Sequence, residues 1–306
     1  MQGTPQLLQY RFNFLKYKNV SIFVCLIALA MGFAGYFMRG GFKYAIDFTG
    51  GAELRLSFEK KLETSQLRAV MNKHGWSDVV IQEVGTAGQK FLIVMGVDKF
   101  DSSLEQKVMT GLQAELPDNK AVIENIELVG PEVGKDTKWN AIKAVLLSII
   151  ILLFYIAIRS EFRFGVGATV ALIHDIFIVL AFLLFTGEPI SLHVLAAILA
   201  VIGYSLNDTI IIFSRIQENL RKLRGVPEQE IVNLSINQTL TRTILTSFAT
   251  FLAVLAIFFL GGETLRGLSL VMGIGIIFGT YSSIYVASAV VLAIGKFGNK
   301  KVAVSR

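Results

Sequence analysis

Six long apolar segments divide the chain, and each is about as long as the ~20 residues that an α-helix needs to cross a bilayer. They cover residues 20–38, 140–158, 165–186, 191–213, 240–260 and 267–294. All five prolines of the chain fall outside them. Because proline interrupts a helix interior, the pattern predicts six uninterrupted transmembrane helices.

The first apolar segment also has features of a cleavable signal. Arg11, Lys16 and Lys18 precede it, and Ala28-Leu29-Ala30 resembles a signal-peptidase site. The apolar run continues through Phe37, beyond that site. On length, we expect an uncleaved membrane anchor.

The pattern changes between the first two segments, where short strands and helices are predicted. Leu54, Leu56 and Phe58 alternate with polar residues, as on a half-buried strand. Further strands and helices are predicted at 64–74 (helix), 79–84 and 90–97 (hairpin), 102–115 (helix) and 121–129 (strand). The order β-α-β-β-α-β is that of a ferredoxin-like module.

The predicted fold class is therefore a polytopic α-helical membrane protein with a small α+β ferredoxin-like extracytoplasmic domain. We expect residues 1–38 to form the cytoplasmic N-terminus and transmembrane helix 1, and residues 39–139 to form the extracytoplasmic domain. Residues 140–306 then contain transmembrane helices 2–6, short loops and a cytoplasmic C-terminus. Gly275 and Gly279 in the last segment predict a close helix-packing face.

Composition supports a membrane protein. Hydrophobic residues make up 53% of the chain and charged residues 17%, and the mean hydropathy is +0.60. These values are too apolar for a soluble domain of this length. The net charge of +6 does not indicate nucleic-acid binding, because the basic residues lie between apolar segments rather than on one face.

The basic residues predict the topology. They concentrate in 1–19, 159–164, 214–236 and 295–306, whereas the short turns 187–190 and 261–266 contain only Arg266. By the positive-inside rule both termini are cytoplasmic, and the domain at 39–139 is outside. The basic amphipathic stretch 215–230 predicts an interfacial helix that ends near Gly225.

Two ionisable residues in apolar segments are the main functional candidates. Asp208 lies in 201–213 and Arg242 in 237–260. A charge in hydrocarbon costs at least ~2.5 kcal/mol near a helix centre, so it is retained where it is paired, hydrated or used. At similar depths on successive segments, the two predict an ion pair that opens and closes as Asp208 gains and loses a proton. Asn207 and Thr209 are supporting polar neighbours.

Other polar residues in the spans leave two interpretations open. His174-Asp175 lies mid-span, where snorkelling does not explain it, so it is either a structural pair or a second proton site. Thr239, Thr243 and Thr246, with Thr250 following, form a stripe beside Arg242. Such a stripe is either part of a water-lined path or a helix-packing surface.

The stretch Asp47-Phe48-Thr49-Gly50-Gly51 is a candidate hinge or seam beside the extracytoplasmic domain, because glycine adds backbone freedom. The sequence contains no ATP-binding loop, cofactor motif or metal-ligand spacing, and its single cysteine, Cys25, gives no disulfide framework. His74, in the predicted module, is interpreted as a surface residue at a helix end. We expect no catalytic residues, cofactor or metal, and no enzyme activity.

Three stretches carry a resemblance to a known family. They are DFTGG at 47–51, VIGYSLNDT at 201–209 with IFSRI and ENL shortly after it, and NQTLTRT at 237–243. Together they resemble the SecF family, the smaller membrane subunits of the bacterial SecD–SecF protein-export complex. That family belongs to the resistance–nodulation–division superfamily, so each chain is one half of such a transporter.

The resemblance implies use of the proton motive force to promote late steps of Sec-dependent protein export. It implies SecD, the SecYEG channel, other translocon accessory proteins and exported unfolded polypeptide as partners, and the bacterial cytoplasmic (inner) membrane as location. Two other functions stay open. A proton-coupled small-molecule efflux subunit would have two fused halves with larger outer domains. A passive translocon scaffold would not need Asp208, Arg242 and Asp175 in hydrocarbon.

Overall fold

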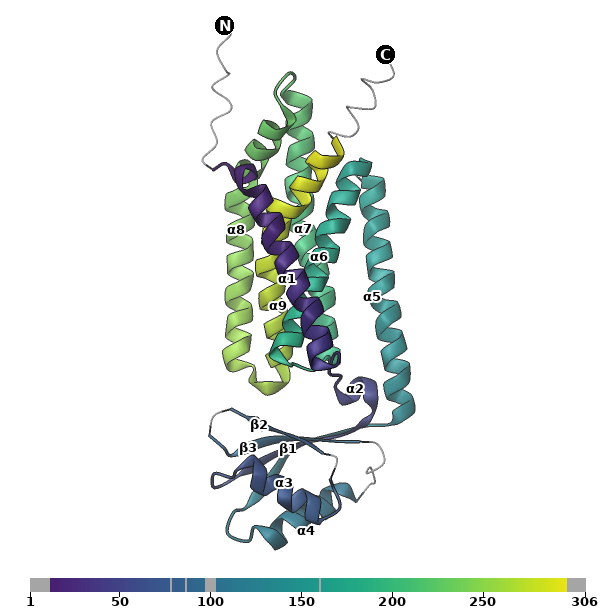
Figure 1. Ribbon diagram of the computed structural model, residues 1–306, viewed down its shortest axis with the longest axis vertical. Helices are drawn as coiled ribbons and strands as arrows, with labels where there is room; N and C mark the ends of the chain where they lie inside the picture. Colours follow the sequence, from purple (N-terminus) through teal and green to yellow (C-terminus); the bar gives the residue numbers. More distant parts are fainter. Residues whose placement is uncertain (1–11, 78, 86, 97–102, 160, 296–306) are drawn as a thin grey trace. The chain divides into compact units, whose positions relative to one another are not determined.

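The computed structural model describes residues 12–77, 79–85, 87–96, 103–159 and 161–295. The described residues form two compact units. Tyr44–Ala144 is a small domain, and the remaining residues form a helical membrane unit. Figure 1 shows both units, and each is described separately below.

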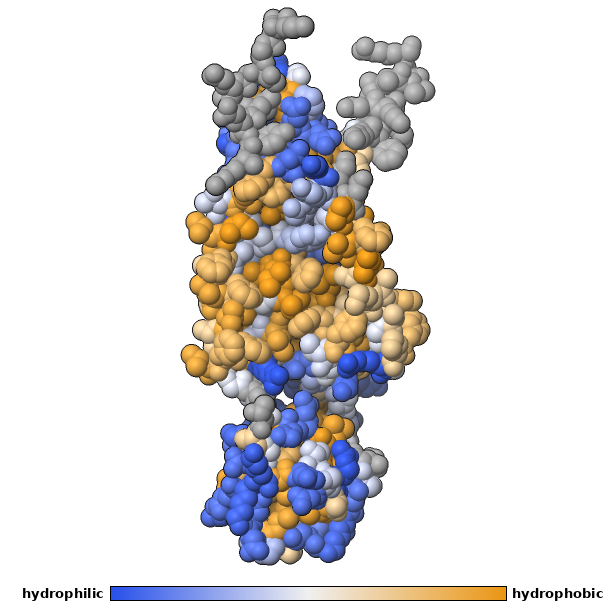
Figure 2. All heavy atoms as spheres, turned by 60° about the vertical axis from the view of Figure 1, so that its left-hand side comes forward, coloured by the Kyte–Doolittle hydropathy of each residue, from blue (hydrophilic) through white to orange (hydrophobic). Residues whose placement is uncertain are grey.

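The membrane unit consists of long helices (Figure 1). They are α1 (Lys18–Arg39), α5 (Pro131–Arg159), α6 (Phe162–Thr186), α7 (Leu192–Lys222), α8 (Glu228–Leu260) and α9 (Gly262–Ser282), and a π-helical turn at Ser283–Ala287 extends α9. Short connections join α5 through α9, and the small domain lies in the chain between α1 and α5. Within the described residues, six segments are long and apolar enough to cross a membrane. Figure 2 shows hydrophobic residues gathered along the visible face of this unit. The predicted six transmembrane helices are confirmed.

Several helices are longer than their apolar cores predicted. α5 begins at Pro131, nine residues before the predicted span, and α8 begins at Glu228 rather than near residue 240. The prediction of an interfacial helix at 215–230 is wrong. Residues 215–222 continue α7 without a break, because no proline or glycine interrupts them before Gly225. The polar residues next to the apolar segments of α5, α7 and α8 therefore continue these helices.

α9 packs closely against α7, and glycines make this possible. A Cβ at Gly275 would collide with Val201, and a Cβ at Gly279 would come within 3.0 Å of Ser205. The predicted packing face is confirmed. By contrast, α5 and α8 expose long rows of large apolar side chains, such as Phe154. Such rows suit lipid or a partner in the membrane.

The small domain is a four-stranded antiparallel sheet with two helices. Its elements are β1 (Gly51–Phe58), α3 (Thr64–Lys73), β2 (Val80–Val84), β3 (Lys90–Met95), α4 (Leu104–Glu115) and β4 (Ala121–Val129). The strand order is β2-β3-β1-β4. Each βαβ unit is thus split by an antiparallel strand, as the ferredoxin-like prediction requires. Residues 97 and 102, at the ends of two predicted elements, lie outside the described residues.

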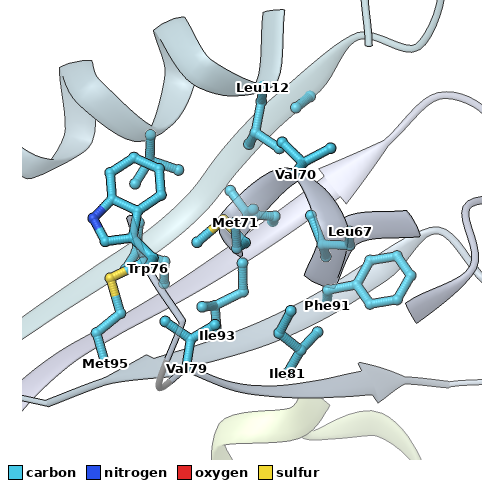
Figure 3. Close-up of a cluster of buried hydrophobic side chains, with 14 of the residues drawn as sticks. Leu67, Val70, Met71, Trp76, Val79, Ile81, Phe91, Ile93, Met95 and Leu112 are labelled. Carbon is cyan, nitrogen blue, oxygen red and sulfur yellow. The ribbon is translucent and has the colours of Figure 1, made fainter. Parts of the chain in front are cut away.

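One face of the sheet buries the core of the domain. Leu54 on β1 pairs with Ile93 and Ile126 on the strands at either side. Leu54 and Ile93 are fully buried, as is Leu67 on α3 (Figure 3). Sheet and helices therefore share one apolar layer, as the alternation of β1 predicted.

Two polar groups of the small domain are His74 and the Glu53–Arg55 pair. His74 is the C-cap residue of α3, lies at the surface and stacks on Trp76, so its predicted position is confirmed. On β1, burial raises the pKa of Glu53, and the neighbouring Arg55, with its guanidinium 3.4 Å away, offsets part of this increase.

The candidate seam is a well-packed turn within the small domain. Ile46–Thr49 forms a single helical turn (α2), and Gly50 follows with φ of 72°. Gly51 has φ of 129°, and a Cβ there would collide with the carbonyl oxygen of Met95. Asp47 is half buried beside this turn. Both glycines have a positive φ, and Gly51 also lies too close to the Met95 carbonyl for a side chain. This favours a fixed seam over a loose hinge.

Gly134, which the sequence did not single out, completes this seam. It lies in the first turn of α5, and a Cβ at this position would come within 2.7 Å of the Gly50 nitrogen. A Cβ at Gly130, just before α5, would meet nothing within 4 Å. We predict that Gly134→Ala destabilises the small domain by about 1–3 kcal/mol, as overpacking does. Gly130→Ala should change stability by less than about 0.5 kcal/mol.

Urea unfolding of the purified full chain, followed by tryptophan fluorescence, measures this difference. Both tryptophans, Trp76 and Trp139, belong to the small domain. Trp76 is buried in that domain, whereas Trp139 is exposed on α5, so the change in fluorescence on unfolding comes mainly from Trp76. Equal midpoints for the two variants would contradict the packing described for Gly134.

Candidate functional site

The three intramembrane ionisable residues lie at two depths. Asp175 is near the middle of α6, between three and four helical turns from either end of that helix. Asp208 is roughly four and a half turns along α7 from Leu192, and Arg242 is about five turns along α8 from Leu260. A short connection makes α7 and α8 antiparallel, so these two distances are measured from the same side of the membrane unit. Asp175 is thus central, whereas Asp208 and Arg242 share a second level, as predicted.

Asp175 is fully buried, and both of its carboxylate oxygens have partners. His174 Nδ1 lies 3.0 Å from Oδ1. The Ser205 hydroxyl on α7 and the Ser282 hydroxyl on α9 both donate to Oδ2, the second at 2.8 Å. Three groups on three helices therefore converge on one carboxyl group and hold it in place.

A π-helical turn follows Ser282, the α9 residue that bonds Asp175, and adds a second buried serine. Ser282 ends the α-helical part of α9, and Ser283 begins the π-turn; both are fully buried. The Ser283 hydroxyl lies 2.8 Å from that of Thr209 and 3.3 Å from the carbonyl oxygen of Ser205 on α7. Such turns often occur at functional sites. Here the turn belongs to a hydroxyl cluster that joins α9 to α7.

Asp208 is equally buried but poorly satisfied. Ser247 on α8 donates to Oδ2 at a long 3.3 Å, and its hydroxyl lies 2.7 Å from that of Thr280 on α9. Oδ1 has no hydrogen-bond partner within the described residues. The hydroxyls of Tyr204 and Thr243, each one helical turn from this cluster, also have none there. A buried polar atom without a partner is costly, so this cluster is suited to take up water or a proton.

Arg242 is exposed on α8, and the predicted ion pair is not formed in this chain alone. Arg242 is near enough for its charge to act on Asp208. Across the described residues, however, no ion pair within 4 Å joins them. Asn207 is likewise exposed on α7, which packs against α8. An exposed arginine and an exposed amide thus lie on adjacent helices of the apolar unit.

The threonine stripe separates into two parts. Thr239 and Thr243 are buried, whereas Thr246 is exposed and Thr250 half exposed. Thr239, Thr246 and Thr250 donate to backbone carbonyls of α8 itself. Within this chain, only the buried part of the stripe lies inside the bundle. Thr243 is the member of the stripe that best fits a functional role, because its buried hydroxyl has no hydrogen-bond partner among the described residues.

Four hydroxyl residues of the site were not singled out by sequence reasoning: Ser247, Thr280, Ser282 and Ser283. The signal available was the polar run Thr280-Tyr281-Ser282-Ser283 within an apolar span. Hydroxyls in membrane helices commonly bond their own backbone, so this run alone does not indicate a cluster. Throughout the part of the chain that is described, no group of three His, Cys, Asp or Glu side chains is placed to hold a metal ion.

Comparison with known proteins places this bundle in a family. Residues 110–297 match the family model of the protein export membrane protein SecD/SecF, C-terminal. The chain belongs to the SecD/SecF family of protein-export membrane proteins. It is 39% identical over 280 residues to protein translocase subunit SecF of Pseudomonas aeruginosa, covering 92% of this chain and 90% of that protein.

A SecDF relative combines the matching region with further chain. Protein translocase subunit SecDF of Thermus thermophilus is 39% identical over 288 residues, which are 92% of this chain and 38% of that protein. The crystal structure of SecDF from Thermus thermophilus superposes with a TM-score of 0.85 at 37% identity over 97% of this chain. This chain spans 40% of that structure.

A second structure, of SecDF in a super-membrane-facing form, superposes with a TM-score of 0.69 over 100% of this chain at 35% identity. The SecD/SecF chain described here is thus a multi-pass membrane protein with one half of a resistance–nodulation–division-type fold and a role in protein export. The SecDF relatives contain further chain beyond the region that matches this one.

The difference between the two carboxylates predicts different effects of removing their charge. Asp175→Asn places an amide N–H₂ against donors, so we expect destabilisation by about 1–3 kcal/mol, the cost of an unsatisfied buried group. Asp208→Asn loses one long hydrogen bond and should change stability by less than about 1 kcal/mol. A bulky thiol dye that labels the buried Cys25 on heating measures unfolding of the membrane unit. Equal melting shifts would contradict the structural role of Asp175.

Proposed function

We propose that this chain uses the proton motive force, together with a SecD-type half, to promote late steps of Sec-dependent protein export. The observation that carries the proposal is Asp208: a buried carboxylate with one oxygen unpartnered among the described residues, near the charge of Arg242, inside a bundle of the SecD/SecF family. Intramembrane acids are retained at this cost where they carry protons or bind a partner.

The proposed proton step alternates two environments of Asp208. When deprotonated, the carboxylate attracts the guanidinium of Arg242 and accepts from Ser247. When protonated, it loses its charge and with it the attraction, so α7 and α8 are free to change their packing. Alternating the neighbouring charge and the desolvation of an acid is how a carboxylate binds and releases protons in turn.

We propose that the partner half covers the exposed faces of α7 and α8. Arg242 and Asn207 lie there, and an uncovered arginine in an apolar belt is unfavourable. The SecDF relative, which contains further chain beyond the matched region, supports a second half in contact with this one. Asp175 and its serines are buried within this chain, so they are assigned to holding α6, α7 and α9 together.

The proposed setting is the cytoplasmic membrane beside the SecYEG channel, with both termini in the cytoplasm. The distribution of Lys and Arg supports this orientation. The small domain then lies outside, where it meets exported unfolded polypeptide. Gly50, Gly51 and Gly134 fix the seam at its edge.

The first test of this function is the loss of the proton site. Asp208→Asn is nearly isosteric but does not ionise, so it should remove the stimulation of export by a proton gradient while the protein stays inserted. The assay follows a preprotein entering inverted membrane vesicles, with and without the gradient. Arg242→Met should have the same effect, and Arg242→Lys should restore it in part, since lysine keeps the charge but not the planar fork.

Glu218→Gln is the matched control for this test. Glu218 lies on the same helix and forms ion pairs with Arg215 and Lys222 beyond the apolar core. Its loss should leave gradient-dependent stimulation unchanged. Full stimulation with Asp208→Asn would remove Asp208 from the mechanism, whatever the control shows.

The partner surface is tested by photo-crosslinking in membranes that contain a SecD-type chain. A photo-crosslinking amino acid at Thr246, on the exposed face of α8, should trap that chain. The same probe at Phe33, which is 70% exposed on α1, should not. Crosslinks from Phe33 alone would place the partner on another face and contradict this part of the proposal.

A further inference from the structure

A row of buried hydroxyl side chains runs along α8 from the Asp208 site toward the start of that helix. Its members follow one another at four-residue steps and are 0% to 8% exposed: Ser235, Thr239, Thr243 and Ser247. Residues at this spacing lie one above another and form a single ridge of a helix. The row differs from the predicted stripe, whose members Thr246 and Thr250 lie toward the surface.

Both ends of the row contact α7. At one end, the Ser247 hydroxyl donates to Oδ2 of Asp208 at 3.3 Å. At the other end, Nδ2 of Asn219 donates to the Ser235 hydroxyl at 2.8 Å. About three helical turns separate the two contacts on each helix. The row therefore lies along the interface between α7 and α8.

The Asn219 end of the row reaches the surface of the unit. Nδ2 of Asn219 also donates to Oε1 of Gln238 at 2.8 Å. Gln238 is exposed, and its Oε1 accepts from Nε of Arg215 at 2.7 Å. In the orientation proposed above, this is the cytoplasmic end of the bundle. The row thus joins the buried Asp208 to polar groups that cytoplasmic water reaches.

The open atoms of the row are at its Asp208 end. Thr243 is 1% exposed, and its Oγ1 has no hydrogen-bond partner among the described residues. Oδ1 of Asp208 also has none there. Thr239, one turn further along, donates to the carbonyl oxygen of Ser235 at 3.1 Å, and its oxygen still has lone pairs to accept with. A proton that leaves the carboxylate therefore meets free acceptors first.

Neighbouring hydroxyls of the row are too far apart to bond directly. Four residues of helix rise about 6 Å, whereas an O–H···O hydrogen bond spans about 2.8 Å. One water molecule between two hydroxyls fits this spacing, and buried water is stable with about two to four polar partners.

We propose that this row is the route by which a proton leaves Asp208 for the cytoplasm. The carboxyl group gives its proton to a water held by Ser247 and Thr243, and waters between the hydroxyls pass it on toward Gln238. Each water accepts one proton and releases another, so no further reactant is consumed. The inference rests on the proposed function and adds the residues of the exit to it.

The facing side of α7 controls when the route conducts. Ile212 and Ile216 follow Asp208 at four-residue steps and are 1% and 0% exposed. Water along the row then has hydroxyls on one side and hydrocarbon on the other. The row therefore takes up water when α7 and α8 loosen, which the neutral form of Asp208 permits in the proposed function.

Access of water to the row is tested with single cysteines in a chain that carries Cys25→Ser. Inverted membrane vesicles that contain this chain and a SecD-type half expose its cytoplasmic face. They are treated with a small cationic methanethiosulfonate, which hydrocarbon excludes, and labelling is followed by mass spectrometry. Thr239→Cys and Thr243→Cys should both be labelled. Asp208→Asn keeps the site neutral, so it should speed labelling of Thr243→Cys by about tenfold, the factor that one lost hydrogen bond corresponds to.

Ser288→Cys is the matched control for access. Ser288 follows the π-turn after α9 and is fully buried, but it does not belong to the row. We expect it to stay unlabelled under the same conditions.

The role of the hydroxyl itself is tested by proton flux. The chain and a SecD-type half are placed in liposomes that enclose a pH-sensitive dye, and a proton gradient is applied. Thr243→Val is nearly isosteric but lacks the hydroxyl, so it should slow the flux by about tenfold or more. Thr243→Ser keeps the hydroxyl and should restore most of the flux. Thr169→Val is the control, because the Thr169 hydroxyl also donates within its own helix, α6, at 2.8 Å and should leave the flux unchanged.

Full flux with Thr243→Val, together with no flux in Asp208→Asn, would overturn the inference and leave the proposed function intact. Equal losses in Thr243→Val and Thr243→Ser would indicate packing rather than proton transfer, and would also overturn it. So would the absence of labelling at both Thr239→Cys and Thr243→Cys, or labelling of Ser288→Cys at the same rate. Flux that survives Asp208→Asn would contradict the proposed function, and this inference with it.

Discussion

The membrane unit depends on one requirement of the hydrocarbon environment: with no water present, each buried polar group must find its partner within the protein. At mid-membrane this requirement is met around Asp175. An imidazole from its own helix, a serine from α7 and a serine from α9 all converge on one carboxylate. Because the three groups come from three helices, the hydrogen bonds also fix how these helices pack. Close approach of α9 to α7 then requires Gly275 and Gly279.

The same requirement gives meaning to the groups that do not meet it within the described part of the chain. Asp208 retains an open oxygen, and Tyr204 and Thr243 nearby retain open hydroxyls. Arg242 extends from an exposed face of α8 rather than pairing with Asp208. A charge and several polar atoms without partners among the described residues gather at one level of the bundle, whereas both oxygens of Asp175 have partners. This contrast separates the residues that maintain the fold from those that we assign to proton coupling and partner binding.

A further open group, His174 Nε2, lies on the other side of the Asp175 cluster. One nitrogen of the ring hydrogen-bonds with Asp175, and the other has no partner among the described residues. In the small domain, packing depends on glycine instead: because Gly134 has no Cβ, the first turn of α5 lies close to Gly50.

The sequence alone determined the six helices and the ferredoxin-like module, because hydrophobic period and segment length are local properties. It also identified Asp208, Arg242 and Asp175, since a charge in an apolar run stands out without any structure. Only the tertiary structure decided which partners these residues have. Ser282 and Ser247 are ordinary hydroxyls in sequence, and their roles arise from contacts between helices more than thirty residues apart. The pairing of Asp208 with Arg242 was predicted from depth along the helices, but rotation about each helix axis, set by packing, directs Arg242 outward instead.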